Sequence, residues 1–504
     1  MPASRSLAAL LAAFIVACAP LLRAEEVSPL PARARAALER ATGYLRSLST
    51  EGGYVWRYSP DLKHRFGEGE EAATPSQILV QPPGTPTIGS AFLRVYAVTR
   101  ERRYLEAARA AALALVRGQL KSGGWDYVVE FDPRKRGAWA YRKAPVVPAT
   151  GQQPRNVSTY DDDNTQSALR FLLAFVDAAK AAPDERDAAV RDCLEFGLRK
   201  LMEAQYPNGG WPQRWPGTPH DAATHPVLRA SYPKDYPREQ PDDNYGGHYT
   251  LNDNTQSDAI RTLLDAHRRT GRADYLKGAQ RGADFLLLAQ LPEPQPAWAQ
   301  QYDAAMHPAW ARAFEPPSVT SKESARVVGL LLDLYLSTGD DKYLKAVAPA
   351  IVWFKRSAIA PGLWARLYEL RTNRPIYGDR DKRIHYTLEE LSEERRNGYE
   401  WRLEFGITGL IERADGIAKL GREKWLVQHG APAVAGAPPA RSKPSRAAEL
   451  EPRVREIIAA LDAQGRWLTP ATRKYQGLDG PWIEMSTFDE NLRTLADYLE
   501  ATAR

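Results

Sequence analysis

Cysteine is nearly absent from the sequence, and its scarcity narrows the chemistry open to the protein. The 504 residues include two cysteines, Cys18 and Cys193, together with 8 histidines and 4 methionines. Cys18 lies in an N-terminal apolar stretch of the kind that is removed on export. If that stretch is cleaved, Cys193 is the sole cysteine, which excludes an intrachain disulfide and a cysteine-based zinc site.

Outside the N-terminus, the sequence offers no apolar run that suggests a membrane span. Arg5 is followed by apolar residues 7–22, a stretch too short for a spanning helix with these flanks. We therefore predict a signal peptide over residues 1–24, cleaved after Ala24, and a secreted or periplasmic protein. The alternative is the lipobox-like Ile-Val-Ala-Cys of residues 15–18, which would leave a lipidated Cys18.

The sequence also lacks a block of basic residues and the common nucleophile motifs. Its formal charge is +6 and its pI is about 9.0, without the Lys/Arg arm of a nucleic-acid-binding protein. Such a balance fits an ordinary solvated surface or a protein that attracts a polyanionic substrate. Gly-x-Ser-x-Gly, His-Glu-x-x-His and phosphate-binding glycine loops are all missing from the sequence.

One sequence motif occurs twice, each time directly before an amphipathic helical pattern. Residues 160–167 read Tyr-Asp-Asp-Asp-Asn-Thr-Gln-Ser, and residues 249–257 read Tyr-Thr-Leu-Asn-Asp-Asn-Thr-Gln-Ser. Aspartate, asparagine, threonine and serine are also the usual caps of helix N-termini, so two capped helices are the simpler interpretation. If the two turns converge in space, their oxygens predict a site for a hard cation such as calcium.

Helical periodicity dominates the sequence and recurs with a period of roughly 70 to 85 residues. Each repeat combines a helix, a Gly-Gly-aromatic turn, a long loop and a further helix. We expect helices over residues 32–48, 88–98, 104–120, 164–182, 187–205, 254–270, 275–288, 321–336 and 343–354. The predicted fold class is all-α: an α/α toroid of repeated helix pairs with long functional loops, plus a short C-terminal helical tail.

The loops and a change of composition define the expected domain organisation. Residues 211–249, 292–317 and 363–381 form long loops rich in proline, aromatics and arginine, which favours function over disorder. We predict a toroid domain over residues 25–430, an Ala/Pro-rich linker over 431–450 and a tail of unknown role over 451–504.

Arginines in these loops and two acidic turns on the same chain fit an acidic polysaccharide substrate. Calcium can bridge protein carboxylates to a substrate carboxylate, and arginine forks can hold others bidentately. Withdrawing electrons from a uronate carboxylate acidifies the neighbouring C–H, which makes β-elimination feasible once a base is present.

Seven short segments, in order along the chain, resemble the pectate lyases of polysaccharide lyase family 10. Among them are Ala-Arg-Ala-Phe-Glu-Pro-Pro-Ser and Leu-Trp-Ala-Arg-Leu-Tyr-Glu-Leu. The segments are residues 209–214, 252–254, 311–318, 363–370, 372–375, 379–381 and 394–399. The likeness extends from about residue 30 to residue 425, and seven ordered segments are highly specific.

The resemblance implies a calcium-dependent enzyme that cleaves polygalacturonate by β-elimination and acts as a monomer. It implies that Arg312 is the catalytic base and that Asp163, Asn164 and Asp253 bind calcium. It further implies four substrate-binding residues, which are Arg366, Arg380, Tyr368 and Asn373. Asp161 and Asp162 make the first acidic turn richer in carboxylates than the family pattern, so the choice among its three aspartates stays open.

Each of these assignments has a simpler structural alternative. Arg312 could form a salt bridge to Glu315 or Asp303, because guanidinium groups are almost always protonated. Arg366 and Arg380 could be scaffold ion pairs. Tryptophans 211, 298 and 364 fit core packing better than sugar platforms, because large aromatic residues dominate protein cores.

Other functions also remain open from the sequence. A uronate hydrolase needs a carboxylic acid and a carboxylate that flank the scissile bond. A non-catalytic glycan-binding toroid and, more remotely, a terpenoid cyclase-like enzyme are the further alternatives. The many loop arginines and the export signal argue against the terpenoid cyclase.

Overall fold

A computed structural model describes residues 29–69, 73–143, 153–241, 245–432, 443–471 and 477–503. The predicted signal peptide and Cys18 lie outside these residues. The described residues form two compact units: the first lies within residues 1–75, 87–111 and 440–504, and the second within residues 76–86 and 112–439. Within the described residues, no helix is both long and apolar enough to span a membrane.

The first unit contains segments from the N-terminal and the C-terminal part of the chain. Its helices are α2 (Leu30–Leu48), α14 (Lys443–Ala460), α15 (Met485–Thr502) and parts of α3 (Thr85–Thr99) and α4 (Arg102–Gly118). Helices α14 and α15 pack on each other and on α2. A small antiparallel sheet is ordered β15 (Ile483–Glu484), β1 (Arg57–Tyr58) and β2 (Arg65–Phe66). The predicted tail is therefore an integral part of this unit, and α14 already begins inside the predicted linker.

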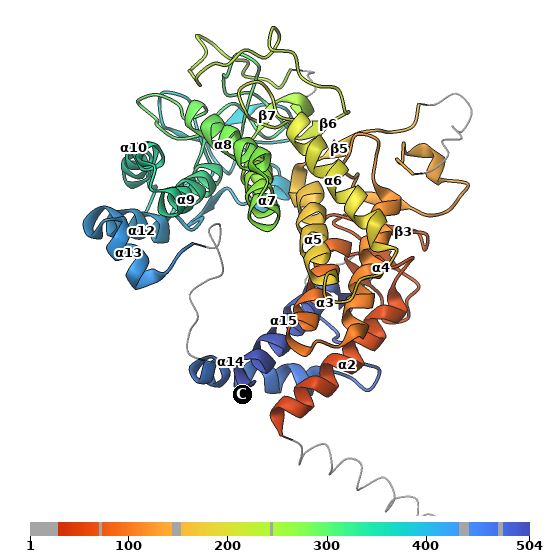
Figure 1. Ribbon diagram of the computed structural model, residues 1–504. Helices are drawn as coiled ribbons and strands as arrows, with labels where there is room; N and C mark the ends of the chain where they lie inside the picture. Colours follow the sequence, from red (N-terminus) through yellow and green to blue (C-terminus); the bar gives the residue numbers. More distant parts are fainter. Residues whose placement is uncertain are drawn as a thin grey trace, which may run out of the picture. The chain divides into compact units, whose positions relative to one another are not determined.

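The second unit is a succession of helix pairs (Figure 1). The pairs are α5 (Asn164–Ala179) with α6 (Asp187–Glu203), α7 (Thr255–Thr270) with α8 (Ala273–Leu288), α9 (Ser321–Thr338) with α10 (Asp341–Ser357), and α12 (Ile407–Leu420) with α13 (Arg422–His429). The first helix of each pair contacts the first helix of the next. The predicted all-α fold of repeated helix pairs, an α/α toroid architecture, is confirmed.

Short strands, two to four residues long, tie the loops of the second unit together. The antiparallel pairs are β3 (Gln77–Leu79) with β4 (Val128–Glu130), β5 (Ser158–Thr159) with β6 (Arg214–Trp215), β7 (Tyr249–Thr250) with β8 (Gln301–Tyr302), and β10 (Trp364–Ala365) with β14 (Arg402–Leu403). A four-stranded sheet is ordered β13 (Ile384–His385), β12 (Pro375–Gly378), β11 (Leu367–Tyr368) and β9 (Val319–Thr320). One-turn helices η1 (Arg136–Ala138), η2 (Asp161–Asp163), η3 (Tyr245–Gly247), η4 (Asn252–Asn254) and α11 (Glu393–Asn397) complete the loops.

A buried tryptophan marks the same place in successive repeats. In each case the indole N–H donates to a carbonyl near the end of the preceding helix, at 2.8 to 2.9 Å. The pairs are Trp125 to Leu115, Trp211 to Leu201, Trp298 to Leu286, Trp364 to Phe354 and Trp467 to Ile457. These side chains are at most 4% exposed, so the packing interpretation of the tryptophans is confirmed. Trp467 shows that the C-terminal tail carries the same repeat.

The turns before these tryptophans explain the glycine pairs of the sequence. Gly123 and Gly209 adopt φ values of 98° and 93°, which residues with a side chain rarely adopt. A Cβ at Gly209 would also lie 2.2 Å from the carbonyl oxygen of Arg281. Glycine is therefore required for the loop to return over the end of its helix.

Candidate active site

The two acidic turns adopt the same unusual backbone. In η2, Asp162 and Asp163 have φ values of 49° and 59°, and in η4, Asp253 and Asn254 have 47° and 64°. Aspartate and asparagine tolerate this left-handed region best among residues with a side chain. Such strain persists only where the surroundings impose it, and it clusters at functional sites.

Each turn is held by the glutamine that follows it. The amide of Gln166 donates to the carbonyl of Tyr160 at 2.8 Å, and the amide of Gln256 donates to that of Thr250 at 2.6 Å. Neither Asp163 nor Asn254, the residue at the start of each helix, caps that helix with its side chain. Helix capping therefore does not explain why the sequence motif occurs twice.

The turns converge, as the cation-site hypothesis requires. Asp161, Asp162 and Asp253 each bring one carboxylate oxygen within 4.8 Å of the others. We call these three residues the tri-aspartate cluster. Two of them come from the first turn and one from the second, so the cluster depends on the packing of η2 against η4.

Neutral donors hold the carboxylates of the cluster in place. Tyr127 and Gln213 donate to Oδ2 of Asp161 at 3.0 and 2.8 Å. Gln81 donates to Asp162 at 3.0 Å, and Asn252 donates to Asp253 at 2.7 Å. Oδ1 of Asp161 is buried and accepts no hydrogen bond from the described residues. The donors orient the carboxylates without neutralising their charge.

The burial and charge of these carboxylates affect proton binding. Burial, together with the charges of Asp161 and Glu323, raises the pKa of Asp253 to about 6. Burial also raises the pKa of Asp161, against the hydrogen bonds from Gln213 and Tyr127. The carboxylates therefore gain stability from a proton or a cation.

The cluster fits calcium. Hard cations select oxygen ligands, and three carboxylates with a buried free oxygen supply them. Asp161, Asp162 and Asp253 would hold the ion. Further oxygen donors would come from water or substrate, because calcium takes 6–8 oxygen ligands.

The structure places Asp163 and Asn164 outside the cluster. The carboxylate of Asp163 pairs with Arg170 on α5. The amide of Asn164 donates to the carbonyls of Trp125 and Asp126 at 3.1 and 3.3 Å. Of the three residues predicted to bind metal, only Asp253 lies in the cluster. Asp161 and Asp162, which the sequence left as alternatives to Asp163, occupy the other positions.

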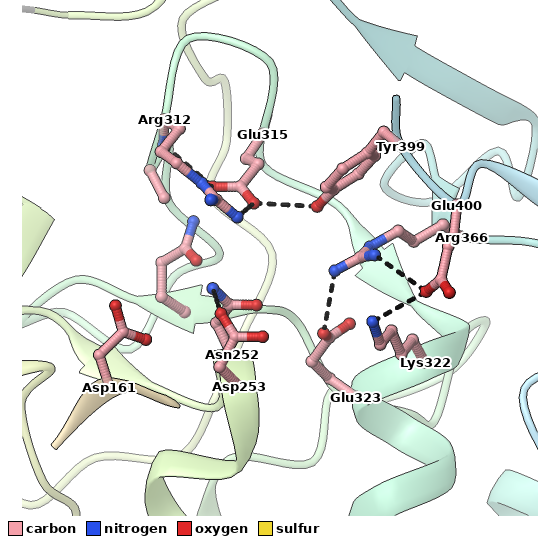
Figure 2. A network of polar contacts seen from close by, with 12 residues as sticks. Asp161, Asn252, Asp253, Arg312, Glu315, Lys322, Glu323, Arg366, Tyr399 and Glu400 are labelled. Atoms are coloured by element: carbon pink, nitrogen blue, oxygen red, sulfur yellow. Dashed lines mark hydrogen bonds and ion pairs between the residues drawn. The ribbon is translucent and has the colours of Figure 1, made fainter. Parts of the chain in front are cut away.

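Arg312 forms the salt bridge to Glu315 that the sequence offered as an alternative (Figure 2). Its Nε and Nη2 lie 2.8 and 2.5 Å from the two oxygens of Glu315. The Arg312 side chain is 43% exposed, whereas that of Glu315 is 1% exposed. Burial alone would lower the pKa of Arg312, but Glu315 raises it above its ordinary value. In this arrangement Arg312 is a cation.

Arg366 lies in a buried layer beside Arg312. Its guanidinium is 3.6 Å from the carboxylate of Glu323 and stacks 4.1 Å from the ring centre of Tyr399. The Tyr399 hydroxyl donates to Glu315 at 2.9 Å, which links the two arginine–glutamate pairs. Figure 2 shows this network next to Asp161 and Asp253. Asp253 senses the charges of both Arg312 and Arg366, so the cluster and the two arginines form one electrostatic site.

The other predicted substrate-binding residues differ in position. Arg380 is 65% exposed, pairs with Glu394 at 3.0 Å and lies 6.0 Å from the ring of Phe314, the ring that Arg312 also faces. Tyr368 is buried, where its hydroxyl donates to the carbonyl of Ser357 at 2.5 Å. Tyr302 makes the same bond to Ala289 in the preceding repeat. Tyr368 thus belongs to the scaffold.

Asn373 also uses its amide within the protein. Its oxygen accepts hydrogen bonds from Trp353 and Gln295 at 2.8 and 3.1 Å, and its nitrogen donates to Ser357 at 2.9 Å. These bonds use the polar atoms that substrate binding would require.

Sequence reasoning missed four residues of the site. Glu315 was named only as a possible partner of Arg312, and Glu323, Tyr399 and Tyr127 were given no role. Glu315 and Tyr399 lie within segments that resemble the family, which was the available signal. Glu323 occupies the start of α9, and only the packing of helices reveals that this point adjoins the acidic turns.

A pocket of about 220 Å³ has Ala311, the residue before Arg312, in its lining. Its lining runs from the loop around Tyr236 to the segment that ends at Ala311, and it includes Trp310 and several prolines. Trp310 fixes the two loops together through a 2.9 Å hydrogen bond to the carbonyl of Pro237. A preformed hollow, of the kind that ligands commonly occupy, thus lies next to the segment that leads to Arg312.

Comparison with known proteins gives likenesses to solved structures and to one family model. A family 10 polysaccharide lyase from Cellvibrio cellulosa, solved as a mutant in complex with trigalacturonic acid, is 22% identical, with a TM-score of 0.44 over 67% of this chain and 98% of that one. Cellobiose 2-epimerase from Bacillus thermoamylovorans is 12% identical, with a TM-score of 0.43 over 93% of this chain and 98% of that one. No curated protein matches. The sequence model of the pectic acid lyases matches residues 142–361 and 357–409, more than half of the chain. The chain therefore belongs to the pectic acid lyase family.

Proposed function

We propose that the protein is a secreted, monomeric pectate lyase that cleaves polygalacturonate by calcium-assisted β-elimination. The products would be oligogalacturonides with a 4,5-unsaturated end. One observation carries the proposal: a carboxylate cluster, in which Asp161 and Asp253 form no salt bridge with a described residue, lies beside Arg312 and Arg366. This arrangement combines a place for a divalent ion, groups that bind carboxylates and a candidate for proton abstraction.

The tri-aspartate cluster would hold the calcium ion. When bound, calcium would supply Lewis-acid chemistry: it would withdraw electrons from a uronate carboxylate and so acidify the proton on the neighbouring carbon. Tyr127, Gln213 and Asn252 keep the carboxylates in position for this role. Because these donors are neutral, they do not themselves cancel the charge of the carboxylates.

Arginines would bind the other carboxylates of the polygalacturonate substrate. A guanidinium binds a carboxylate through two parallel hydrogen bonds, which fixes its orientation as well as its position. Arg366 is buried, and its Nε makes no hydrogen bond within the described residues. Arg380 is exposed and would contact a sugar further along the substrate. We do not place Tyr368 or Asn373 in substrate binding.

Arg312 would contact the proton that is removed. Its Nη1 is free of hydrogen bonds to the described residues, and its side chain is the most accessible of the Arg312, Glu315 and Arg366 group. The charges of Asp253 and Asp161 would hold it at the side of the bound sugar.

Hydrolysis of a uronate is the second candidate, and one observation favours it. Asp253, with a pKa of about 6, could serve as a carboxylic acid next to a second carboxylate. Hydrolysis, however, gives saturated ends, and the cluster would then have no need of a cation.

A spectroscopic assay tests the proposal directly. Purified protein is mixed with polygalacturonate at alkaline pH, with calcium or with a chelator, and near-ultraviolet absorbance is followed. We expect absorbance to grow with calcium and to stop with chelator. New reducing ends without absorbance would instead indicate hydrolysis. Absence of both would reject catalysis on this polymer.

Light scattering of the purified protein tests whether it is a monomer. N-terminal sequencing of the exported protein tests whether it is cleaved after Ala24.

A further inference from the structure

The pocket that has Ala311 in its lining differs in charge from the arginine-rich site. Asp235 and Asp303 line it, and the described residues of the lining include no lysine or arginine. Its two histidines, His248 and His307, are of a residue type that is ordinarily neutral in alkaline solution. A galacturonate carboxylate in this pocket would therefore meet two like charges and no basic partner.

The lining is also poor in hydrogen-bond donors, which a carboxylate requires. Prolines have no backbone N–H to donate. Five prolines line the pocket, and they are Pro233, Pro237, Pro241, Pro308 and Pro317. Three further N–H groups of the lining already donate to oxygens of the protein, His307 at 2.9 Å, Ala309 at 3.2 Å and Ala311 at 3.1 Å. A carboxylate would lose its hydration here with few donors to replace it.

Hydrogen-bond acceptors, by contrast, are available on both aspartates. Oδ1 of Asp235 accepts from the backbone N–H of Tyr236 at 2.8 Å, and Oδ1 of Asp303 accepts from that of His307 at 2.9 Å. Oδ2 of Asp303 is 3.8 Å from Nδ1 of His307, too far for a hydrogen bond. Each aspartate is thus positioned through one oxygen, and its other oxygen can accept from a hydroxyl group.

Two aromatic rings add apolar surface to the lining. The indole N–H of Trp310 donates to the carbonyl of Pro237 at 2.9 Å. The hydroxyl of Tyr236 accepts from Arg238 at 2.9 Å, and Arg238 pairs with Glu369 at the same distance, which compensates its charge. Because the polar atoms of both rings are engaged, the rings offer apolar surface, on which the C–H groups of a sugar can pack.

The loop that forms one wall of the pocket is bound to two segments that carry arginines of the site. The side-chain amide of Gln240 donates to the carbonyl of Ala311, which precedes Arg312. The backbone N–H of Gln240 donates to the carbonyl of Lys382, two residues after Arg380, at 2.9 Å. The volume of about 220 Å³ is below the range of about 300 to 1,000 Å³ that is typical for drug-sized ligands, and it suits one sugar unit.

We propose that this pocket is a subsite for an uncharged sugar unit of the substrate. A methyl-esterified galacturonate and a neutral sugar both present hydroxyl donors and an apolar ring face without a free carboxylate. The subsite rests on the proposed lyase function and defines its substrate more closely, as a galacturonan that contains uncharged units among the charged ones. Asp235 and Asp303 accept hydrogen bonds from the uncharged unit and repel a charged one.

Reversing the charge of Asp235 tests the subsite. Asp235 is exposed, and circular dichroism checks that Asp235→Lys is folded. Initial rates are measured on polygalacturonate and on the same polymer after partial methyl esterification. We expect the wild type to have the lower KM for the esterified polymer. The lysine attracts the free acid and removes a hydroxyl acceptor, so the ratio of the two KM values should shift about 10-fold towards polygalacturonate.

Asp221→Lys is the matched control. Asp221 is exposed and precedes Asp235 in the same long loop, and its Oδ1 also accepts from a backbone N–H, that of Ala223 at 2.9 Å. It does not line the pocket. Its added positive charge should affect both polymers alike and leave the KM ratio at the wild-type value. An unchanged ratio in Asp235→Lys, or an equal shift in both variants, would overturn the subsite.

A third polymer identifies the uncharged unit. On a galacturonan that contains neutral rhamnose units, a KM for the wild type below that for polygalacturonate would support a neutral sugar in the pocket. A lower KM on the methyl-esterified polymer alone would support the ester instead. Equal KM values on all three polymers would overturn the subsite.

Binding without turnover distinguishes failure of the subsite from failure of the proposed function. With chelator present, calorimetry compares the affinity of the wild type and of Asp235→Lys for methyl-esterified trigalacturonate. We expect about 10-fold weaker binding to the variant, whether or not any polymer is cleaved. Equal affinities would overturn the subsite, whereas absence of elimination by the wild type would overturn the proposed function.

Discussion

The aspartates in the two acidic turns and in the helix that follows the second turn fall into two groups with different surroundings. Asp161 and Asp253, in the tri-aspartate cluster, form no salt bridge with a described residue. Asp163 and Asp258, which we call the arginine-paired aspartates, face Arg170, and Arg261 lies 4.0 Å from Asp258. Asp162 and Asp163 are neighbours in sequence, yet Asp162 belongs to the tri-aspartate cluster and Asp163 to the arginine-paired aspartates. The negative charges of Asp163 and Asp258 are therefore paired with arginines in the scaffold. Asp161 and Asp253, at the site, have no such pair among the described residues.

Burial affects both groups, which makes the cations the difference between them. Burial and the neighbouring Asp163 raise the pKa of Asp258 to about 7, against the charges of Arg170 and Arg261. Burial likewise raises the pKa of Asp163 despite Arg170. The scaffold group thus has arginines as direct partners, whereas Asp253 is influenced by Arg312 and Arg366 without a salt bridge to either of them. The predictions below test that contrast, beginning with the largest effect.

Replacing the arginine beside each group should separate catalysis from stability. Arg312→Ala removes the group that contacts the transferred proton, so we expect kcat to fall about 1000-fold or more while the protein stays folded. Arg170→Ala should leave kcat per folded molecule near wild type. It should lower the free energy of unfolding by about 2 kcal/mol, less than for a fully buried pair, since Asp163 would lose its partner. Initial rates and chemical denaturation measure the two effects.

The contrast would fail if Arg312→Ala kept substantial turnover, or if Arg170→Ala were inactive although folded. Substrate binding to the Arg312→Ala protein, followed by calorimetry, excludes a general loss of the site.

Replacing single aspartates should identify the calcium ligands. We expect Asp161→Asn and Asp253→Asn each to weaken calcium binding by 10-fold or more, because each removes a charge from the cluster. Asp163→Asn should leave calcium affinity unchanged and lower thermal stability. Calcium titration calorimetry, with unfolding temperatures at several calcium concentrations, gives both quantities. Calcium affinity that falls only in Asp163→Asn would return the metal to the residue chosen from the sequence.

The pH dependence follows from Asp253. Its pKa of about 6 in the fold exceeds its ordinary value of 3.8, so the folded state binds more protons than the unfolded state between these values. Without metal, stability should therefore decrease as pH rises from about 4 to about 6, by at most about 3 kcal/mol. Calcium favours the ionised form, so its affinity should increase over the same range and level off above it.

Asp253→Asn provides the control for this titration. The variant should lose most of the pH-dependent step in metal-free stability. Equal slopes in wild type and Asp253→Asn would show that another group titrates there.

Much of the fold, but only part of the site, could be predicted from the sequence. Helix periodicity and the Gly-Gly-aromatic turns gave the repeats, because each repeat satisfies the same local packing and hydrogen bonds. The cluster required two facts that residue types do not carry. Left-handed φ angles at Asp162 and Asp163 direct adjacent carboxylates to different partners, and the packing of η2 on η4 decides which aspartates meet.

The resemblance also transferred residues whose role is structural. Tyr368 and Asn373 lie within segments that match the family, but a matched segment contains scaffold residues as well as functional ones. Their complete hydrogen bonding within the protein is visible only in three dimensions. Conversely, Trp467 repeats the contact of Trp211, although the tail of the chain showed no motif that suggested it.

The smallest effect should come from an arginine that pairs at the surface. Arg380 and Glu394 are 65% and 55% exposed, so their salt bridge contributes little to stability. Arg380→Ala should raise KM for polygalacturonate by a few-fold and leave kcat and the unfolding temperature almost unchanged. Arg383 is the matched control: it is 64% exposed and pairs with Glu239 at 3.1 Å. If Arg383→Ala raised KM equally, the effect would be the loss of general positive charge. A higher KM in Arg380→Ala alone would instead place a substrate carboxylate at Arg380, separate from the carboxylate that binds at the tri-aspartate cluster.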